Sequence, residues 1–222
     1  MNKQELLKIA KPILFSTEMV QAILEGRKIV IRRAIKFDLG LADTDKNDSS
    51  YLMIPDTDGD YHHAKDYCRY RVGDYLYVRE TFCEVPYEYE HIPIKDGHIT
   101  VPKIAYKADS ETDYTGIWKP SIHMPKDLAR IFLKVIDVRV ERLQDITQEQ
   151  ALKEGLTGLR CGCNVNAYAC TDCLNSGWLE RPQLDFIHLW NSMIKKSDAD
   201  RYGWEANPFV WVIEFERVEV KK

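Results

Sequence analysis

A glycine between an amphipathic segment and a β-branched segment constrains this chain more than any other short feature. Residues 16–24 place apolar side chains at helical spacing, and Ser16 precedes them as a helix N-cap. Gly26 follows at the position past a helix end where a left-handed backbone costs glycine least. The run from Ile29 to Ile31 is β-branched and favours a strand. The sequence therefore predicts a helix that stops at Gly26 and turns directly into a strand.

Cations surround this turn. Arg27, Lys28, Arg32 and Arg33 lie within seven residues, with no acidic residue among them. They predict either a local anion site or a solvated turn with long, partly buried side chains. Because side chains alternate along a strand, Lys28 and Arg32 are expected on one face, and Ile31 with Arg33 on the other. We therefore expect Lys28 and one of the two arginines inside the protein.

The pattern Gly-Arg-Lys, followed after three residues by Arg-Arg, resembles the signature of ASCH domains, a branch of the PUA-like β-barrels. Four other stretches resemble prophage-type ASCH proteins in the same order: residues 11–16, 72–82, 119–125 and 207–215. The resemblance implies an α+β fold, a PUA-like mixed β-barrel with a few surrounding helices. It also implies nucleic-acid or nucleotide binding in a phage or prophage context, although a few small members are amidohydrolases acting on acetylated cytidine.

The length and composition are those of a globular protein. The chain has 222 residues, of which 45% are hydrophobic and 30% charged, enough for one sizeable core. We expect a single domain over residues 1–222, with insertions at about 38–66, 84–115 and 156–180. No apolar run approaches the roughly 20 residues of a membrane span, and the N-terminus lacks the apolar core of a signal peptide. These features predict a cytoplasmic protein with no membrane partner.

The overall charge argues against a protein that wraps duplex DNA through its phosphates. The net charge is −4 and the pI is near 5.9, whereas such proteins usually present a basic surface. A nucleic-acid contact is therefore expected to use a local patch or a pocket for one nucleotide. Twelve tyrosines and five tryptophans offer stacking surfaces, although most are expected in the core.

Four cysteines give the clearest chemical signal. They form two short-spaced pairs about ten residues apart, at Cys161, Cys163, Cys170 and Cys173. This spacing is typical of a tetrahedral zinc site, with disulfides or free thiols as the alternatives. Four thiolates close the coordination sphere, so the predicted Zn²⁺ is structural and staples an insertion that is too poor in apolar residues to fold by itself. Cys68 and Cys83 are expected as buried small apolar residues.

The family resemblance also implies a reactive set. In the amidohydrolase members this set is a lysine, a threonine three residues later and a distant glutamate. Lys28 matches the lysine, and Glu154 in a predicted short helix best matches the glutamate. The threonine position holds Ile31, which has no hydroxyl to attack a carbonyl or relay a proton. The resemblance therefore implies the pocket and argues against the hydrolase activity in its known form.

A proline-containing loop over residues 118–125 is expected to complete the ligand site. It carries an indole ring, a hydroxyl, an imidazole and a thioether, which suit either a base-binding wall or a packed loop that seals the barrel. Glu80 could join the site or form a buried ion pair with Arg33. The residues expected to contact a ligand are Lys28, Arg32, Arg33, Arg79, Glu80, Trp118, Ser121 and His123.

Three functions remain open from the sequence. The first is binding of RNA, single-stranded nucleic acid or a modified nucleotide. The second is hydrolysis of a modified nucleoside or RNA, amidohydrolase-like or ribonuclease-like, with Lys28 and Glu154 as catalytic residues. The third is a phage morphogenesis or protein-interaction factor in which barrel and zinc are structural. The acidic net charge favours the last two over broad duplex binding, and the sequence predicts no oligomeric state.

Overall fold

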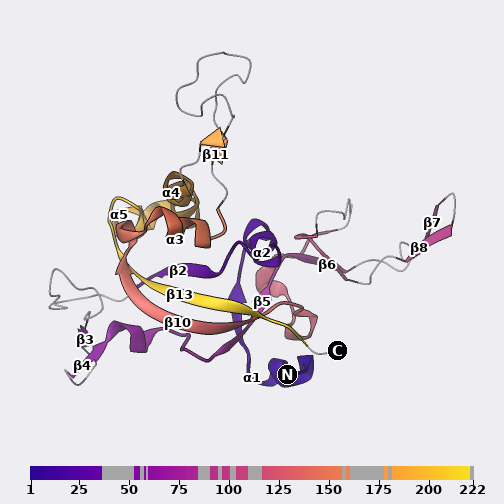
Figure 1. Ribbon diagram of the computed structural model, residues 1–222, viewed down its shortest axis with the longest axis horizontal. Helices are drawn as coiled ribbons and strands as arrows, with labels where there is room; N and C mark the ends of the chain where they lie inside the picture. The colour runs from indigo at the N-terminus through magenta and orange to yellow at the C-terminus, as the bar shows by residue number, and fades with distance from the viewer. Residues whose placement is uncertain are drawn as a thin grey trace, which may run out of the picture. The chain divides into compact units, whose positions relative to one another are not determined.

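The computed structural model describes residues 1–36, 53–55, 58, 60–84, 91–94, 97–100, 104–109, 117–156, 159–160, 178–179 and 182–220. Over these residues the chain is an α+β protein with a mixed five-stranded sheet and a few helices, as Figure 1 shows. The predicted α+β class is confirmed. Closure of the sheet into a barrel stays a prediction.

The regular elements of these residues are short, apart from two long strands. The α-helices are α1 (Lys3–Ile9), α2 (Thr17–Leu24), α3 (Gln148–Lys153), α4 (Pro182–Met193) and α5 (Ala199–Tyr202). The strands are β1 (Lys11–Leu14), β2 (Val30–Ala34), β3 (Met53–Pro55), β4 (Tyr61–His63), β5 (Tyr75–Arg79), β6 (Phe82–Glu84), β7 (His91–Ile94), β8 (Gly97–Thr100), β9 (Ile104–Tyr106), β10 (Phe132–Arg142), β11 (Leu159–Arg160), β12 (Trp178–Leu179) and β13 (Phe209–Val218). Single turns of 3₁₀-helix include η2 (Ala64–Tyr67) and η4 (Ser121–His123).

The five-stranded sheet has the order β1-β5-β10-β13-β2. β1 runs parallel to β5, while β10 runs antiparallel to β5 and β13 antiparallel to β2. Two-stranded pairs lie within the three predicted insertions: β3 with β4, β7 with β8, and β11 with β12. Within the predicted insertion at 38–66, β3 and β4 pair antiparallel, with Met53 opposite His63.

The chain divides into two compact units, each described here by itself. The first unit comprises Met1–Glu25, Asp74–Lys134 and Arg217–Lys222, and the second comprises Gly26–Gly73 and Val135–Glu216. The core of the first unit joins α1 to β5, β6 and the start of β10. Its buried members include Leu6, Ala10, Tyr77, Phe82, Met124, Ala129 and Phe132.

In the second unit, helices cover one side of β2 and β13. α3, α4 and α5 lie together over these strands in Figure 1. The buried members of this core include Val30, Leu143, Ile146, Ala151, Phe186, Trp190, Val210 and Val212. Burial of these apolar side chains is the main favourable term that holds α3 and α4 against the sheet.

The predicted helix, glycine stop and strand are all present. The Met19 N–H donates to the Ser16 Oγ at 3.4 Å, so Ser16 caps α2 as expected. Gly26 has φ of 75°, and β2 begins at Val30. None of the helices in the described ranges is long and apolar enough to cross a membrane.

Replacement of Gly26 by alanine is expected to destabilise the protein through its backbone alone. A Cβ built at Gly26 meets nothing within 4 Å, so the substitution creates no clash. The left-handed conformation itself costs an alanine about 1–2 kcal/mol. Chemical denaturation should therefore show a loss of that order for Gly26→Ala, and a smaller loss for Gly26→Asn, because asparagine enters this region more readily. Equal losses for the two variants would contradict this explanation.

Candidate functional site

A buried ion cluster connects the turn after Gly26 to the end of α3. The Lys28 Nζ donates to the Glu154 carboxylate at 2.6 Å and to the Glu154 carbonyl at 3.0 Å. The Arg32 Nη1 donates to the other oxygen of the same carboxylate at 3.0 Å. The three residues are only 1%, 4% and 3% exposed for Lys28, Glu154 and Arg32 respectively. The structure thus brings together the two residues that the family resemblance placed in one reactive set.

Local backbone structure explains this meeting. Thr147 opens α3 with a capping box to Gln150, and Glu154 is the C-cap residue. Gly155 follows with φ of 89°, which ends the helix. Lys28 and Glu154 then form an isolated antiparallel bridge, and the Ile29 N–H donates to the Lys153 carbonyl at 2.9 Å.

Alternation along β2 separates the remaining residues of the signature. Lys28 and Arg32 share the face that meets Glu154, whereas Arg33 is exposed. The expectation that one of the two arginines lies inside is therefore confirmed, and that arginine is Arg32. Ile31 is 4% exposed and packs in the core, so its side chain supplies no polar group at the threonine position.

Arg32 has a second carboxylate partner that the sequence analysis did not identify. Its Nη2 donates to Glu141 on β10 at 3.2 Å, and its guanidinium lies 5.8 Å from the Phe186 ring centroid. Its Nε is buried and has no hydrogen-bond partner within the part of the chain that the structure describes. A sequence signal for Glu141 exists, because Asp137, Arg139 and Glu141 occupy every second position and a strand places such residues on one face.

Burial controls the protonation of Lys28. Desolvation lowers the pKa of the Lys28 ammonium below its ordinary value of 10.5, and Arg33 and Arg32 add to the lowering by charge repulsion. Glu154 opposes this shift through its charge and its hydrogen bond. A neighbouring carboxylate with a lysine of lowered pKa is an arrangement that can exchange a proton with a bound group.

The first unit holds the other residues expected at the ligand site. Arg79, at the end of β5, donates from Nε to the Met124 carbonyl at 3.1 Å and from Nη2 to the Ile122 carbonyl. The Glu80 N–H donates to the Met124 sulfur at 3.2 Å. These contacts fasten η4 to the end of β5, so Arg79 supports the loop instead of pointing a free guanidinium at a ligand.

Of the two alternatives for Glu80, the structure favours a buried ion pair, but the pairing with Arg33 is wrong. Arg130, rather than Arg33, binds the Glu80 carboxylate, with its Nε and Nη2 at 2.8 and 2.9 Å from the two oxygens. Arg130 also binds Asp109 at 2.9 Å and stacks over the Tyr106 ring at 4.0 Å. Arg33 and Glu80 belong to different units, and no spacing in the sequence pointed to Arg130.

The loop over residues 118–124 is anchored at both ends. Phe82 and Lys119 exchange two backbone hydrogen bonds, at 3.2 and 2.8 Å, and Met124 is buried. Trp118 packs against Cys83 and Ala105, which favours the packed-loop alternative for this ring. Ser121 is half-buried and His123 is exposed. The structure therefore holds this loop in one unit and the Lys28 cluster in the other.

The four cysteines of the predicted zinc site lie outside the described residues. Their segment is flanked by the antiparallel pair of β11 and β12, which sets Leu159 opposite Leu179 and Arg160 opposite Trp178. No group of three or more metal-binding side chains occurs elsewhere, as far as the chain is described. Cys68 and Cys83 are buried, as predicted.

Lys28 is expected to titrate below the ordinary range of lysine, and Glu154→Gln is expected to lower its pKa further. The substitution removes the charge that favours the ammonium form. NMR detection of the Lys28 side chain across an alkaline titration measures both values. Because the unfolded chain keeps this proton over a range where the folded chain has lost it, the Lys28 contribution makes the free energy of unfolding rise with pH there. An ordinary lysine titration in the wild-type protein would contradict the assignment.

Comparison with known proteins adds no relative to this geometry: the chain matches no protein-family model, no curated protein and no solved structure.

Proposed function

We propose that this protein binds RNA, single-stranded nucleic acid or a modified nucleotide through the Lys28–Arg32–Glu154 cluster, as an ASCH-type, PUA-like protein of a phage or prophage. The proposal combines the sequence signature around Gly26 with the position of its cations in the fold. In this proposal the five-stranded sheet is part of a PUA-like barrel.

One observation carries the proposal: the buried Nε of Arg32, which has no acceptor among the described residues. A buried donor without a partner costs about 1–3 kcal/mol, so native proteins rarely keep one without a reason. A ligand atom that accepts from this N–H would remove the cost. The same ligand could accept a hydrogen bond from the Lys28 ammonium and donate one to the Glu154 carboxylate.

The surrounding ion pairs support a functional reading of the cluster. A buried ion pair adds little net stability, because desolvation of the charges offsets most of their attraction. Buried ionisable groups with perturbed pKa values, such as Lys28, are concentrated at functional sites. Here Lys28 and Arg32, from the turn before β2 and from β2 itself, meet Glu154 at the end of α3, more than 120 residues away in the sequence.

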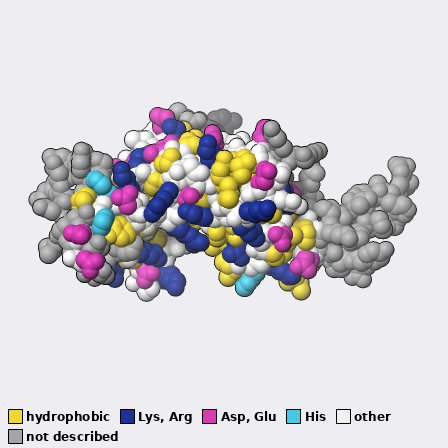
Figure 2. Space-filling model, turned by 90° about the horizontal axis from the view of Figure 1, so that it is seen from below, with side chains coloured by type: hydrophobic (Ala, Val, Ile, Leu, Met, Phe, Trp, Pro, Cys, Tyr) yellow, Lys and Arg dark blue, Asp and Glu magenta, His cyan; other side chains and the backbone are white. Residues whose placement is uncertain are grey.

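The charge distribution favours a ligand contact of small extent. On the face seen in Figure 2, Lys and Arg side chains lie among Asp and Glu side chains instead of forming a field of one sign. A protein that follows a long phosphate backbone needs such a field. One nucleotide, or a short single-stranded segment, suits this protein better.

Hydrolysis of a modified nucleoside or of RNA is the second candidate, and the 2.6 Å contact between Lys28 and Glu154 favours it. The two groups could act as acid and base on a bound amide or ester. Ile31 contributes no hydroxyl to this set, so the binding function is preferred. A phage morphogenesis or protein-interaction role, with the cluster purely structural, is the remaining alternative.

Structural Zn²⁺ is part of the proposal. Cys161, Cys163, Cys170 and Cys173 supply the sulfur donors that zinc prefers, in number sufficient to close its coordination sphere. The pairing of β11 with β12 brings the two ends of the cysteine segment together, which lowers the entropy lost when a metal closes the loop.

Lys28→Ala is expected to abolish or strongly weaken binding of nucleosides and short single-stranded RNA. Affinity can be measured by titration at low and high salt. Binding by the wild-type protein should fall only weakly with salt, because about one or two phosphates are neutralised rather than six or more. Lys153→Ala is the matched control, since Lys153 is partly exposed and pairs with Glu149 on α3.

The same samples separate the three candidate functions. Release of cytidine from acetylated cytidine by the wild-type protein, read by chromatography, would favour the hydrolase; we expect none, and a gain in Ile31→Thr would support the pocket geometry. If wild-type and Lys28→Ala proteins bind alike, or neither binds at millimolar concentration, the cluster is structural and the interaction role moves ahead.

About one zinc ion per chain is expected in protein purified without added metal. Elemental analysis measures the content, and thiol titration measures how many cysteines react. Cys161→Ser should lose the metal and destabilise the cysteine segment more than the sheet, because metal binding supplies much of the folding free energy of such a segment. Cys68→Ser is the control, since Cys68 lies outside the predicted ligand set. Less than about 0.2 zinc per chain, with four freely reacting thiols beyond Cys68 and Cys83, would contradict a site that binds zinc nearly irreversibly.

A further inference from the structure

Arg32 bonds its carboxylates through different guanidinium nitrogens from those that Arg130 and Arg139 use. Arg130 bonds Glu80 through Nε and Nη2 and Asp109 through Nη1. Arg139 likewise bonds Glu141 through Nε at 2.6 Å and Asp137 through Nη1 at 2.9 Å. Arg32 donates from Nη1 and Nη2 to two different carboxylates, and its Nε has no acceptor among the described residues. Its side chain is nevertheless the most buried of the three.

The two carboxylates fix the direction of this remaining donor. The guanidinium is planar, so its five N–H vectors move together. Glu154 holds Nη1 from the end of α3, and Glu141 holds Nη2 from β10. With both ends held, the Nε–H has one orientation, and the Phe186 ring lies 5.8 Å from the centre of the group.

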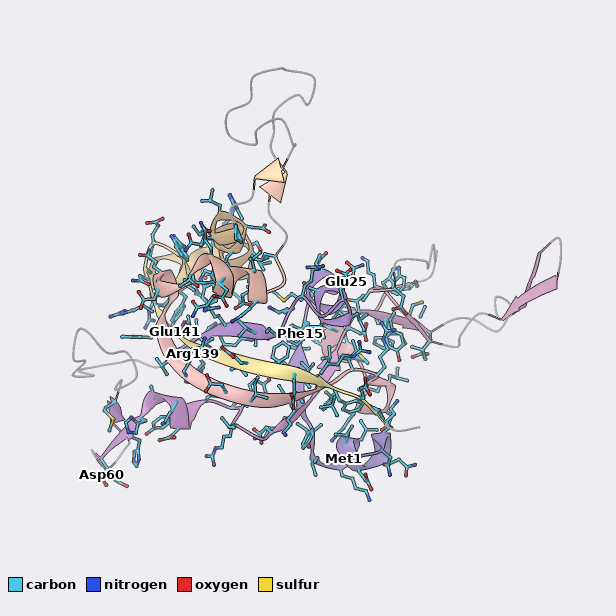
Figure 3. The ribbon with its side chains drawn as sticks, in the orientation of Figure 1. Met1, Phe15, Glu25, Asp60, Arg139 and Glu141 are labelled. Carbon is cyan, nitrogen blue, oxygen red and sulfur yellow. The ribbon has the colours of Figure 1, made fainter. Side chains whose placement is uncertain are left out.

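Glu141 is itself held in place. Its Oε2 accepts from Arg32, and its Oε1 accepts from the Arg139 Nε. Figure 3 labels Arg139 and Glu141 next to each other on β10. Arg139 is bound in turn by Asp137 on the same strand and by Glu214 on β13. A series of contacts of alternating sign therefore runs from Lys28, which is buried, to Arg139, whose side chain is 30% exposed.

The four groups bonded to one another around the Arg32 guanidinium have balanced charges before any ligand binds. Lys28 and Arg32 contribute two positive charges, and Glu154 and Glu141 contribute two negative charges. A phosphate placed here would bring an uncompensated charge into a desolvated site, which is costly. A carbonyl oxygen or ring nitrogen accepts a hydrogen bond without this cost.

We infer that Glu141, supported by Arg139, is a positioning residue of this site: it aligns the Arg32 guanidinium so that the Nε–H donates to an uncharged acceptor, as on a nucleobase. The ligand half of this inference rests on the proposed function. The alignment of Arg32 by Glu141 does not, because it is a property of the protein without ligand.

The test compares three variants with the wild-type protein, two of which are isosteric Glu→Gln substitutions. Glu141→Gln removes the charge that holds Nη2, and Arg139→Gln removes the support of Glu141. Glu149→Gln makes the same chemical change at an exposed carboxylate, which pairs with Lys153 on α3. Thermal unfolding confirms that each variant is folded, and the Arg139→Gln variant keeps the test valid should Glu141→Gln fail to fold.

The first measurement needs no ligand. The Nε–H resonance of Arg32 is assigned by its loss in Arg32→Lys and is followed by ¹⁵N NMR. Glu141→Gln is expected to shift this resonance and to speed its hydrogen exchange, Arg139→Gln to do so less, and Glu149→Gln to leave it unchanged. An unchanged resonance in a folded Glu141→Gln protein overturns the positioning role, whatever the ligand is.

The second measurement uses cytidine, uridine and inorganic phosphate as probes. A nucleoside is expected to bind the wild-type protein. Glu141→Gln is expected to lower its affinity about tenfold, which corresponds to the difference between a charge-assisted and a neutral hydrogen bond. Glu149→Gln should bind as the wild type does. Binding of phosphate in preference to the nucleosides would overturn the inference that the acceptor is uncharged. If no nucleoside binds the wild-type protein, the proposed function and the ligand half fail together, while the NMR comparison still decides the positioning role.

Discussion

The contact between Lys28 and Glu154 organises the second unit. It joins a lysine just before β2 to the last residue of α3, and the accompanying bond from Ile29 to Lys153 fixes their register. Both charges are removed from water, so each depends on the other for solvation. The pair holds the end of α3 beside the entry to β2, and Arg32, on the same face of β2, bonds the same carboxylate.

In the first unit, a cationic side chain is partnered by backbone groups instead of carboxylates. Arg79 donates to the carbonyls of Ile122 and Met124, and the Met124 sulfur accepts from the Glu80 amide. A loop that would otherwise have few partners is thereby fastened to β5. Its exposed residue His123 is thus displayed by a fixed backbone, in contrast to the enclosed charges of the second unit.

Local signals in the sequence predicted local structure well. The N-cap at Ser16, the stop at Gly26 and the strand that follows all depend on neighbouring residues, and all are present. The pairing of Lys28 with Glu154 was reached only through a family resemblance. Ion-pair partners such as Arg130 for Glu80 are set by tertiary packing across 50 residues, which no periodicity encodes. The alternative that paired Arg33 with Glu80 failed because strand alternation predicts which residues share a face but not whether that face is buried.

Because positive and negative side chains alternate along the cluster, substitution of different residues has different effects on stability. Loss of Lys28 leaves Glu154 still bonded to Arg32, whereas loss of Glu154 leaves two buried cations near each other without the carboxylate between them. Substitutions along this series are therefore not additive, and their order decides which intermediates can fold. A lineage that replaced the cluster with apolar residues would pass through less destabilised intermediates if the cations changed before the glutamate. Substitution of Lys28 is therefore expected to be tolerated better than substitution of Glu154, which bonds both cations.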